Sequence, residues 1–236
     1  MIFIKITYKV ILSWKVIMHN TVQNLINIEN QLKSKIVDLA NNVIPKIIAV
    51  SKTFDIDRIL PLIEHGHLDY GENKVQEAIN KWTDIKTQNK YIKIHLIGKL
   101  QTNKVKLAVK IFDYIHSVDN EKLARKIADE QAKQSKKIKI FIQVNIGSEE
   151  QKSGIVKHEA ANLLEYCKKL NLNVIGTMCI PPKNYNINKH FIEMNMINKS
   201  LQLKDLSMGM SEDYLEAARN NATYLRIGSK IFGKRD

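Results

Sequence analysis

Lys52 lies at the end of an apolar run, where a lysine can do covalent chemistry. The run Ile47 to Val50 is followed directly by Ser51, Lys52 and Thr53. A buried strand that ends here delivers a primary amine to the mouth of a sheet or barrel. Desolvation there lowers the pKa of the amine and frees its lone pair to attack an aldehyde. The alternative is a strand-end lysine that only extends into water, so other residues must decide between the two.

A second segment, residues 207–211, could bind an anion such as a phosphate group. Its sequence is Ser-Met-Gly-Met-Ser, and it precedes a helix that we expect over residues 212–220. Backbone N–H groups and two hydroxyls would then lie at the positive end of a helix dipole. Glu212 and Asp213 place negative charge in the same helical turn, so their side chains must point away from a bound anion.

Short apolar runs alternate with helical patterns along the chain, and this alternation predicts a parallel sheet. We expect strands at residues 46–50, 68–70, 93–97, 114–117, 138–145, 173–179, 205–208 and 224–227. Between them we expect helices at 56–65, 74–82, 102–111, 120–134, 157–170, 187–201 and 212–220, with an extra N-terminal helix at 21–42. Eight strands favour an α/β fold closed into a (β/α)8 TIM barrel. An open doubly wound sheet is the second choice, because the chain has no GxGxxG or P-loop sequence.

Polar residues follow most of the expected strands, which is where barrels carry their active sites. They include Lys52, Asn73, Gln101, His116, Asn145, Ser207 and Arg226. Each has a structural alternative: Glu72 and Asn73 as helix caps, His95 and His116 as buried core histidines, and Asn145 as a turn residue. Their accumulation on one rim favours a functional site.

A closed barrel would make Lys52, after the first strand, a neighbour of the anion segments after the seventh and eighth strands. Gly228 and Ser229 follow the eighth strand and add a close-approach glycine and a hydroxyl. A phosphorylated aldehyde would bridge the two halves, and pyridoxal 5′-phosphate (PLP) is the commonest one. Arg226 beside a pyridine nitrogen would stay protonated and weaken the ring as an electron sink. Such a site would form a Schiff base yet stabilise carbanions poorly.

Eight ordered motifs resemble those of the YggS/PROSC family, the pyridoxal phosphate homeostasis proteins. They are IAVSKT (48–53), GENKVQE (71–77), HLIGKLQTNK (95–104), HSVD (116–119), QVNIGSEEQKSGI (143–155), GTMCIP (176–181), LSMGMSED (206–213) and RIGSKIFGKRD (226–236). The resemblance runs from about residue 24 to the C-terminus. It implies a PLP-binding barrel like the N-terminal domain of alanine racemase, of fold-type III, without that enzyme's second domain.

The resemblance also implies roles for individual residues. Lys52 matches the Schiff-base lysine and Arg226 matches the residue that faces the pyridine nitrogen. The phosphate shell would comprise Ser207, Ser211, Gly228 and Ser229, and the rim residues near the ring would be Asn73 and Asn145. Lys152 matches a lysine linked to cofactor handling. Phe54, Lys74 and Lys99 depart from the residues usual in the family, which puts the rate of cofactor exchange in question more than binding.

Composition limits the other functions. The chain has 236 residues, which fit one domain over 18–236, and a formal net charge of +13. That charge permits nucleic-acid or membrane-surface binding, but the densest cluster, Lys133, Lys136, Lys137 and Lys139, has no interleaved aromatic residues and is better explained as a solvated helix end. Two cysteines without metal-ligand spacing predict a cytoplasmic protein with no metal site.

Residues 1–17 form an apolar extension interrupted by Lys5, Lys9 and Lys15. They are too short and too charged to span a bilayer, and lack the uninterrupted centre of a signal peptide. The extension is either disordered or upstream of the natural start; a short targeting or membrane-touching segment is the alternative.

These observations predict a PLP carrier that buffers or delivers the cofactor, without a catalytic residue and without turnover. A PLP-dependent amino-acid racemase is the alternative, although Lys52 is the one base we can assign and a racemase needs one on each face of the ring. The expected partners are PLP and apo forms of PLP-dependent enzymes. We expect a monomer that has no specific nucleic-acid partner.

Overall fold

The strands form a closed parallel barrel, as the alternating pattern predicted. The computed structural model describes residues 18–36, 44–149, 153–182 and 186–234. The strands are β1 (Lys46–Val50), β2 (Asp69–Glu72), β3 (Lys93–Leu96), β4 (Tyr114–Val118), β5 (Lys139–Gln143), β6 (Asn173–Met178), β7 (Asp205–Ser207) and β8 (Tyr224–Ile227). They pair in chain order, and β8 closes the barrel on β1. The TIM-barrel prediction is confirmed, and the open-sheet alternative is excluded.

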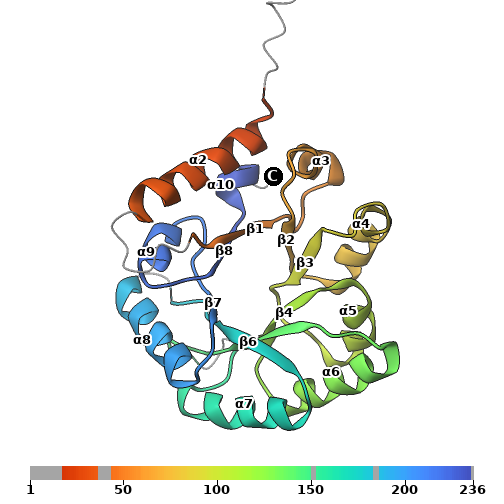
Figure 1. Ribbon diagram of the computed structural model, residues 1–236, viewed down its shortest axis with the longest axis vertical. Helices are drawn as coiled ribbons and strands as arrows, with labels where there is room; N and C mark the ends of the chain where they lie inside the picture. Colours follow the sequence, from red (N-terminus) through yellow and green to blue (C-terminus); the bar gives the residue numbers. More distant parts are fainter. Residues whose placement is uncertain (1–17, 37–43, 150–152, 183–185, 235–236) are drawn as a thin grey trace, which may run out of the picture.

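Helices surround this barrel in a ring (Figure 1). They are α2 (Asn20–Ile36), α3 (Ile56–Glu64), α4 (Val75–Gln88), α5 (Val105–Ile111), α6 (Glu121–Gln134), α7 (Ala160–Lys169), α8 (Ile187–Ser200), α9 (Tyr214–Arg219) and α10 (Ser229–Phe232). The turns η1 (Thr102–Lys104) and η2 (Lys157–Glu159) lead into α5 and α7. Each expected helix is present, with shifted ends.

The N-terminal helix α2 covers the part of the barrel that the short segment after β8 does not cover (Figure 1). In the part of the chain that the structure describes, the helix after β8 is α10, whose four residues are too few to cover the barrel. Figure 1 shows α2 alongside α10, between α3 and α9. The Asn24 side-chain amide donates to the Ile231 carbonyl at 3.0 Å, and Leu25 is buried. The apolar stripe of α2 is therefore needed to complete the ring.

Several element boundaries differ from the sequence prediction. The second strand extends to Glu72, so Gly71 and Glu72 belong to β2 rather than to the loop after it. Helix α9 begins at Tyr214, because Asp213 closes the preceding loop by accepting from the Met210 N–H. The short helix α10 was not predicted. Residues 37–42, expected in the first helix, lie outside the described residues, as does the extension over 1–17.

Two apolar clusters stabilise the fold. The larger one fills the space between strands and helices and includes Trp82, Phe112 and Leu225. The smaller one lies inside the barrel and contains Ile48, Tyr114, Phe141, Met178 and Tyr224. Side chains alternate between these clusters because successive residues of a strand point to opposite faces. The barrel interior is thus packed rather than open, with room for polar side chains only where they bond to one another.

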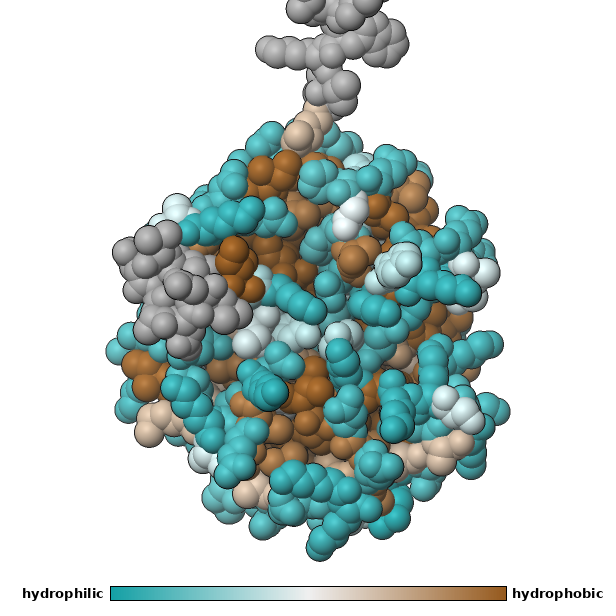
Figure 2. All heavy atoms as spheres, viewed as in Figure 1, coloured by the Kyte–Doolittle hydropathy of each residue, from teal (hydrophilic) through white to brown (hydrophobic). Residues whose placement is uncertain are grey.

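The outer surface mixes polar and apolar residues. Figure 2 shows polar side chains spread over the ring of helices, with apolar side chains exposed between them in places. Among the residues that the structure describes, no helix is long and apolar enough to cross a membrane.

Candidate functional site

Lys52 lies in a turn just beyond the C-terminal end of β1. The Phe54 N–H donates to the Ser51 carbonyl at 3.2 Å and closes this turn. Thr53 has a φ of 67°, which is unusual for a β-branched residue and fixes the direction of the chain. Lys52 lies two residues beyond Val50, the last residue of β1. The half-buried Lys52 therefore stands at the barrel mouth, as predicted.

Arg226 lies inside the barrel on the neighbouring strand. Arg226 on β8 is paired with Ile48 on β1, so it sits one strand away from the segment that carries Lys52. Its guanidinium donates from Nη1 to Ser207 Oγ at 2.7 Å and from Nη2 to the Cys179 carbonyl at 2.8 Å. Burial lowers the pKa of Arg226, and the two bonds hold the guanidinium in place. The side chain is thus a fixed donor below the mouth.

A chain of hydrogen bonds continues from Arg226 through the barrel. His116 Nδ1 lies 3.0 Å from Ser207 Oγ, and His116 Nε2 lies 3.0 Å from His95 Nδ1. His95 Nε2 lies 2.9 Å from Asp69 Oδ1. The rings are held by stacking, since His95 lies over Tyr114 and His116 over Phe141, with centroids 4.1 and 4.2 Å apart. Five strands are connected in this way.

The hydrogen bonds from Arg226 to Asp69 must all be donated in one direction, because of the chemistry of these two end groups. Arg226 can only donate and an ionised Asp69 can only accept. Ser207 therefore accepts from Arg226 and donates to His116 Nδ1, which leaves His116 with its proton on Nε2. His116 then donates to His95, which must also be neutral with its proton on Nε2 in order to donate to Asp69. Every donor has one acceptor in this arrangement.

The pKa shifts agree with two neutral histidines. Burial, with His95 and Arg226 nearby, holds the pKa of His116 well below its usual range. Burial also lowers the pKa of His95, although Asp69 opposes that effect. For Asp69 itself burial is the largest influence and favours the protonated form, but the hydrogen bond from His95 and the nearby positive groups together outweigh it, so the pKa of Asp69 is lowered. Asp69 is therefore an anion at neutral pH, as the direction of the chain requires.

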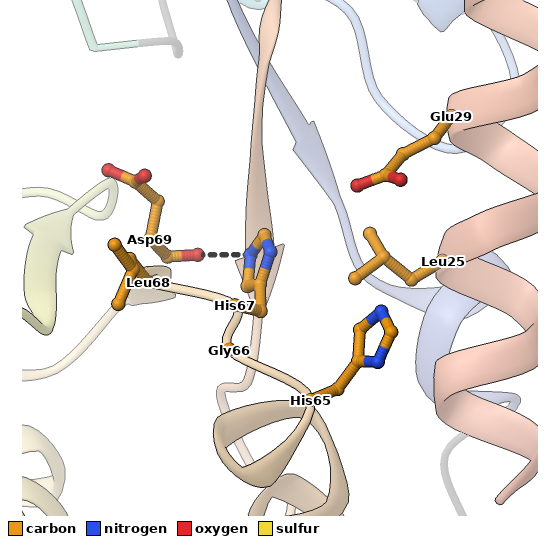
Figure 3. Close-up of a pocket in the computed structure, with 7 residues that line it drawn as sticks. All are labelled: Leu25, Glu29, His65, Gly66, His67, Leu68 and Asp69. Carbon is orange, nitrogen blue, oxygen red and sulfur yellow. Dashed lines mark hydrogen bonds between the residues drawn. The ribbon is translucent and has the colours of Figure 1, made fainter. Parts of the chain in front are cut away.

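Asp69 lies where β2 begins, at the opposite end of the barrel from Lys52. Figure 3 shows its carboxylate directed away from Glu29 on α2, while its backbone carbonyl bonds to the His67 ring at 2.9 Å. Burial lowers the pKa of His67, so this ring too is neutral near pH 7. Asp69 therefore belongs both to the lining of the pocket drawn in Figure 3 and to the end of the hydrogen-bond chain that runs through the barrel.

The two segments expected to bind an anion meet beyond β7 and β8. The Lys230 N–H donates to Ser211 Oγ at 3.3 Å, which ties the loop after β7 to the start of α10. Gly209 has a φ of 88°, and a Cβ there would lie 2.5 Å from the Ala217 Cβ. Gly228 is buried against Val50 of β1, and Ser229 is exposed. The structure therefore brings Ser211, Gly228 and Ser229 to one side of the mouth.

Ser207 differs from these residues in its surroundings. Its hydroxyl is buried inside the barrel, between Arg226 and His116. One lone pair and the hydroxyl proton are already used there. The Ser207 hydroxyl therefore holds the Arg226 guanidinium in place. This contact could not be predicted from the sequence.

Asn73 and Asn145 lie on the same end of the barrel, after β2 and β5. Asn73 is half-buried, and its backbone would contact a Cβ placed on Gly98. The Asn145 amide donates to the Glu149 carbonyl at 2.8 Å, so it closes its own turn, as the structural alternative proposed. Lys152, assigned to cofactor handling, lies outside the described residues.

The residues that depart from the family have simple surroundings. The Phe54 ring packs on Phe232 with 5.0 Å between centroids, joining the Lys52 turn to α10. Lys74 caps the N-terminus of α4 without a side-chain bond, and Lys99 is exposed. Phe54 thus provides a packing contact between the Lys52 turn and α10, where a charged side chain is usual in the family.

The basic cluster on α6 and β5 is spread over separate contacts within the chain. Lys133 pairs with Glu130 at 3.5 Å, Lys136 donates to the Lys110 carbonyl and Lys139 to the Tyr114 hydroxyl at 3.2 Å. These contacts favour a helix end over a nucleic-acid surface.

Sequence reasoning missed most of the polar residues around the site. Asp69 and Lys81 were not identified. His116 was counted among the polar residues at strand ends, and His95 and His116 were each weighed as a buried core histidine without the hydrogen bond between them. Glu72 was weighed as a helix cap, but the cap of α4 is Lys74 and the Glu72 side chain is buried between β2 and α4. One usable signal was that His95 and His116 each lie two residues after the first residue of their strands, at positions that face the interior.

Comparison with known proteins agrees with this architecture. Residues 26–236 match the family model described as alanine racemase, N-terminal domain. An alanine racemase of Clostridium difficile superposes with a TM-score of 0.71 at 14% identity, covering 92% of this chain and 57% of the racemase. At that identity the likeness shows the fold alone. The predicted fold, of the fold-type III barrel kind, is confirmed.

More similar relatives carry a specific name. A pyridoxal phosphate homeostasis protein of Vibrio alginolyticus is 35% identical over 203 residues, covering 81% of this chain and 87% of the relative. That of Aquifex aeolicus is 36% identical over 200 residues, covering 80% and 87%. PipY of Synechococcus elongatus, solved with PLP bound, is 30% identical with a TM-score of 0.80 and covers 90% of this chain and all of PipY. The chain therefore belongs to the family of pyridoxal phosphate homeostasis proteins, built on the alanine racemase N-terminal fold.

Proposed function

We propose that this chain binds PLP at the C-terminal mouth of the barrel and takes part in PLP homeostasis, holding the cofactor on Lys52 and buffering or delivering it. The observation that carries the proposal is the placement of Lys52 beside the loops after β7 and β8, with Arg226 buried on β8 between them. PipY, which shares this barrel, has been solved with PLP bound.

The residues present fit the cofactor at both of its ends. Gly209 and Gly228 keep the backbone of the two loops free of side chains, and the hydroxyls of Ser211 and Ser229 supply donors for a phosphate. Arg226 offers a fixed, positively charged donor to a ring nitrogen. Asn73 and Asn145 are proposed to line the rim, and Ser207 to hold Arg226 more than to bind phosphate.

Lys52 would supply the covalent bond. Its neutral amine adds to the aldehyde carbon and one water molecule leaves, so that a C=N bond replaces the C=O bond without any oxidant or reductant. The reverse reaction with water returns the free lysine and the aldehyde, which suits storage and release. PLP supplies electrophilic chemistry in enzymes, but the Arg226 cation opposes protonation of the ring nitrogen and favours a carrier.

A racemase is the second candidate because the barrel is shared with alanine racemase. Such an enzyme needs a base on each face of the cofactor, and Lys52 is the one candidate that the sequence supplies. Incubation of the loaded protein with single L-amino acids separates the two: a carrier leaves chirality unchanged, whereas racemisation at about 1 per second or faster indicates an enzyme.

Lys52→Ala tests the proposed tether. The wild-type protein is expected to gain the visible absorption band of a lysine–PLP Schiff base, and Lys52→Ala is expected to lack it. Borohydride reduction followed by peptide mass spectrometry should place the label on Lys52. Lys230→Ala, with an exposed side chain on the same rim, is the matched control and should keep the band. A wild-type protein without the band contradicts the proposal.

Three finer points remain part of the proposal. Transfer to apo forms of PLP-dependent enzymes is expected, and recovery of activity by a chosen apo-enzyme measures it. A monomer is expected by sedimentation at micromolar concentration. A cytoplasmic location is supported by Cys167 and Cys179, which are buried free thiols.

A further inference from the structure

A buried cluster of charges lies directly behind the turn that carries Lys52. Lys81 on α4 has a side chain that is 10% exposed, and it contacts Glu72 of β2 at 3.0 Å and Glu77 of α4 at 3.1 Å. The Glu72 side chain is fully buried and also accepts from the Trp82 indole N–H at 2.9 Å. A buried ion pair is weak evidence for stability, because removing charges from water costs about as much as their attraction returns. The cluster therefore calls for another reason.

The cluster bonds to the chain on both sides of Lys52. Lys81 Nζ donates to the Ser51 carbonyl at 2.8 Å, and the Ser51 hydroxyl donates to Glu72 Oε1 at 2.8 Å. On the other side, the Thr53 N–H donates to Glu77 Oε1 at 2.5 Å. The residues before and after Lys52 are thus attached to different members of one cluster, Ser51 to Lys81 and Glu72 and Thr53 to Glu77.

The backbone of this turn needs such support. Thr53 adopts a left-handed conformation that is strained for a β-branched residue. The Glu77 bond to its N–H opposes relaxation of that conformation. Lys81 and Glu77 are four residues apart on α4 in the favourable order for a helical ion pair, so the helix presents both groups to the turn.

We propose that Lys81, Glu72 and Glu77 are positioning residues that hold the Lys52 amine at the angle needed for bond formation with the cofactor aldehyde. The proposal rests on the proposed function. Lys81 satisfies its three N–H donors with two carboxylates and one main-chain carbonyl, and through that carbonyl it fixes the end of β1. Glu77 fixes Thr53 by accepting from its N–H. The cluster contacts the turn from the α4 side.

Lys81→Gln tests this directly by separating bond formation from ligand binding. The rate of Schiff-base formation after mixing with PLP is measured by stopped-flow absorbance. Affinity for pyridoxine 5′-phosphate, which has an alcohol in place of the aldehyde, is measured by calorimetry. We expect bond formation to slow on the order of tenfold or more, since small misplacements of reacting groups cost that much, while affinity for the alcohol changes less than about twofold.

Two further variants control the experiment. Lys86→Gln is matched, because Lys86 on the same helix also bonds a main-chain carbonyl, that of Ile111, and a carboxylate, that of Asp113, but away from the turn. It should keep the wild-type rate. The Glu77 side chain is 24% exposed, so this site tolerates substitution better than the more buried Lys81. The glutamine of Glu77→Gln keeps an acceptor for the Thr53 N–H, so this variant should slow bond formation less than Lys81→Gln.

The outcomes are distinguishable. Wild-type rates in both Lys81→Gln and Glu77→Gln overturn the proposal, and so does an equal loss of rate and of alcohol affinity in Lys81→Gln and Lys86→Gln. If the wild-type protein forms no Schiff base and behaves like Lys52→Ala, the proposed function fails and this inference fails with it. Slow bond formation confined to the two cluster variants supports the positioning role even if Lys81→Gln is less stable, because alcohol binding reports that the site is folded.

Discussion

Arg226 and Asp69 have opposite charges but do not touch. A chain of hydrogen bonds through three neutral side chains connects them. His116, His95 and Ser207 each donate one hydrogen bond and accept one, so the positive and negative ends stay connected across the barrel. This arrangement meets the requirement that buried polar groups find partners. It also means that Arg226 is held by residues far from the mouth.

The direction of this chain gives a measurable protonation pattern. We expect His95 and His116 to be neutral at pH 7 with the proton on Nε2, as measured by ¹⁵N chemical shifts. Asp69→Asn replaces a charged acceptor with a neutral one, so it should move the His95 Nε2 signal and destabilise the fold by about 1–2 kcal/mol.

Asp205→Asn is the control for that experiment. Asp205 also lies at the start of a strand, but it accepts from the Thr223 hydroxyl rather than from a histidine. The His95 signal should not move in this variant. A proton on Nδ1 of either ring, or a charged ring at pH 7, would contradict the deduced direction.

At the scale of elements, the loops after β7 and β8 are shaped by close approach. The loop after β7 passes so near α9 that a side chain at Gly209 would meet Ala217, and the Lys230 N–H fastens this loop to α10. The short α10 is itself held by α2 through Asn24 and by α3 through the Arg58 bond to the Phe232 carbonyl at 2.6 Å. The rigidity of the proposed anion site therefore depends on the packing of the four helices α2, α3, α9 and α10 around it.

Gly209→Ala tests this dependence with a matched glycine elsewhere. Gly209 and Gly66 have φ values of 88° and 93°, so alanine strains the backbone at both, by about 1 kcal/mol or more. A Cβ at Gly66 meets nothing within 4 Å, whereas at Gly209 it collides with Ala217. Both variants should lose stability in urea unfolding, and Gly209→Ala alone should bind PLP more weakly. Equal affinity in the two variants would argue against a role for this loop.

At the scale of the whole molecule, the barrel buries histidines that are neutral in the folded state. The pKa values of His67, His95 and His116 are lowered by burial, and each is expected near 6.5 in the unfolded chain. The unfolded chain therefore binds more protons below that pH. The stability that these residues provide is present above pH 6.5 and is lost as the pH falls through their folded pKa values.

We expect the free energy of unfolding in urea to fall between pH 7.5 and 5.5. Each histidine that stays neutral contributes up to about 1.4 kcal/mol per pH unit below 6.5. Glu72 opposes this trend, because burial raises its pKa and it gains stability from protonation as the pH falls. His116→Gln should show a smaller slope with pH than the wild-type protein. An unchanged slope would mean that His116 does not remain neutral in the fold.

Much of the architecture follows from local sequence. The apolar runs that predicted strands at 46–50, 93–97 and 224–227 form β1, β3 and β8, because a short apolar run between turn residues favours a buried strand. Lys52 and Gly209 were found because their types and places relative to a strand are visible in the chain itself. The short α10 was missed because four residues carry no periodic signal.

What the sequence by itself determined was the number and order of the strands, the family, and the residues at the strand ends that could meet PLP. Only the tertiary structure decided that Ser207 bonds to Arg226 and His116, which is 91 residues away from Ser207, and that Lys81 reaches back 30 residues to Ser51. The reason is physical. Which side chain of one strand faces which of another depends on barrel closure and register, and these are set by the packing of the whole chain rather than by any one segment.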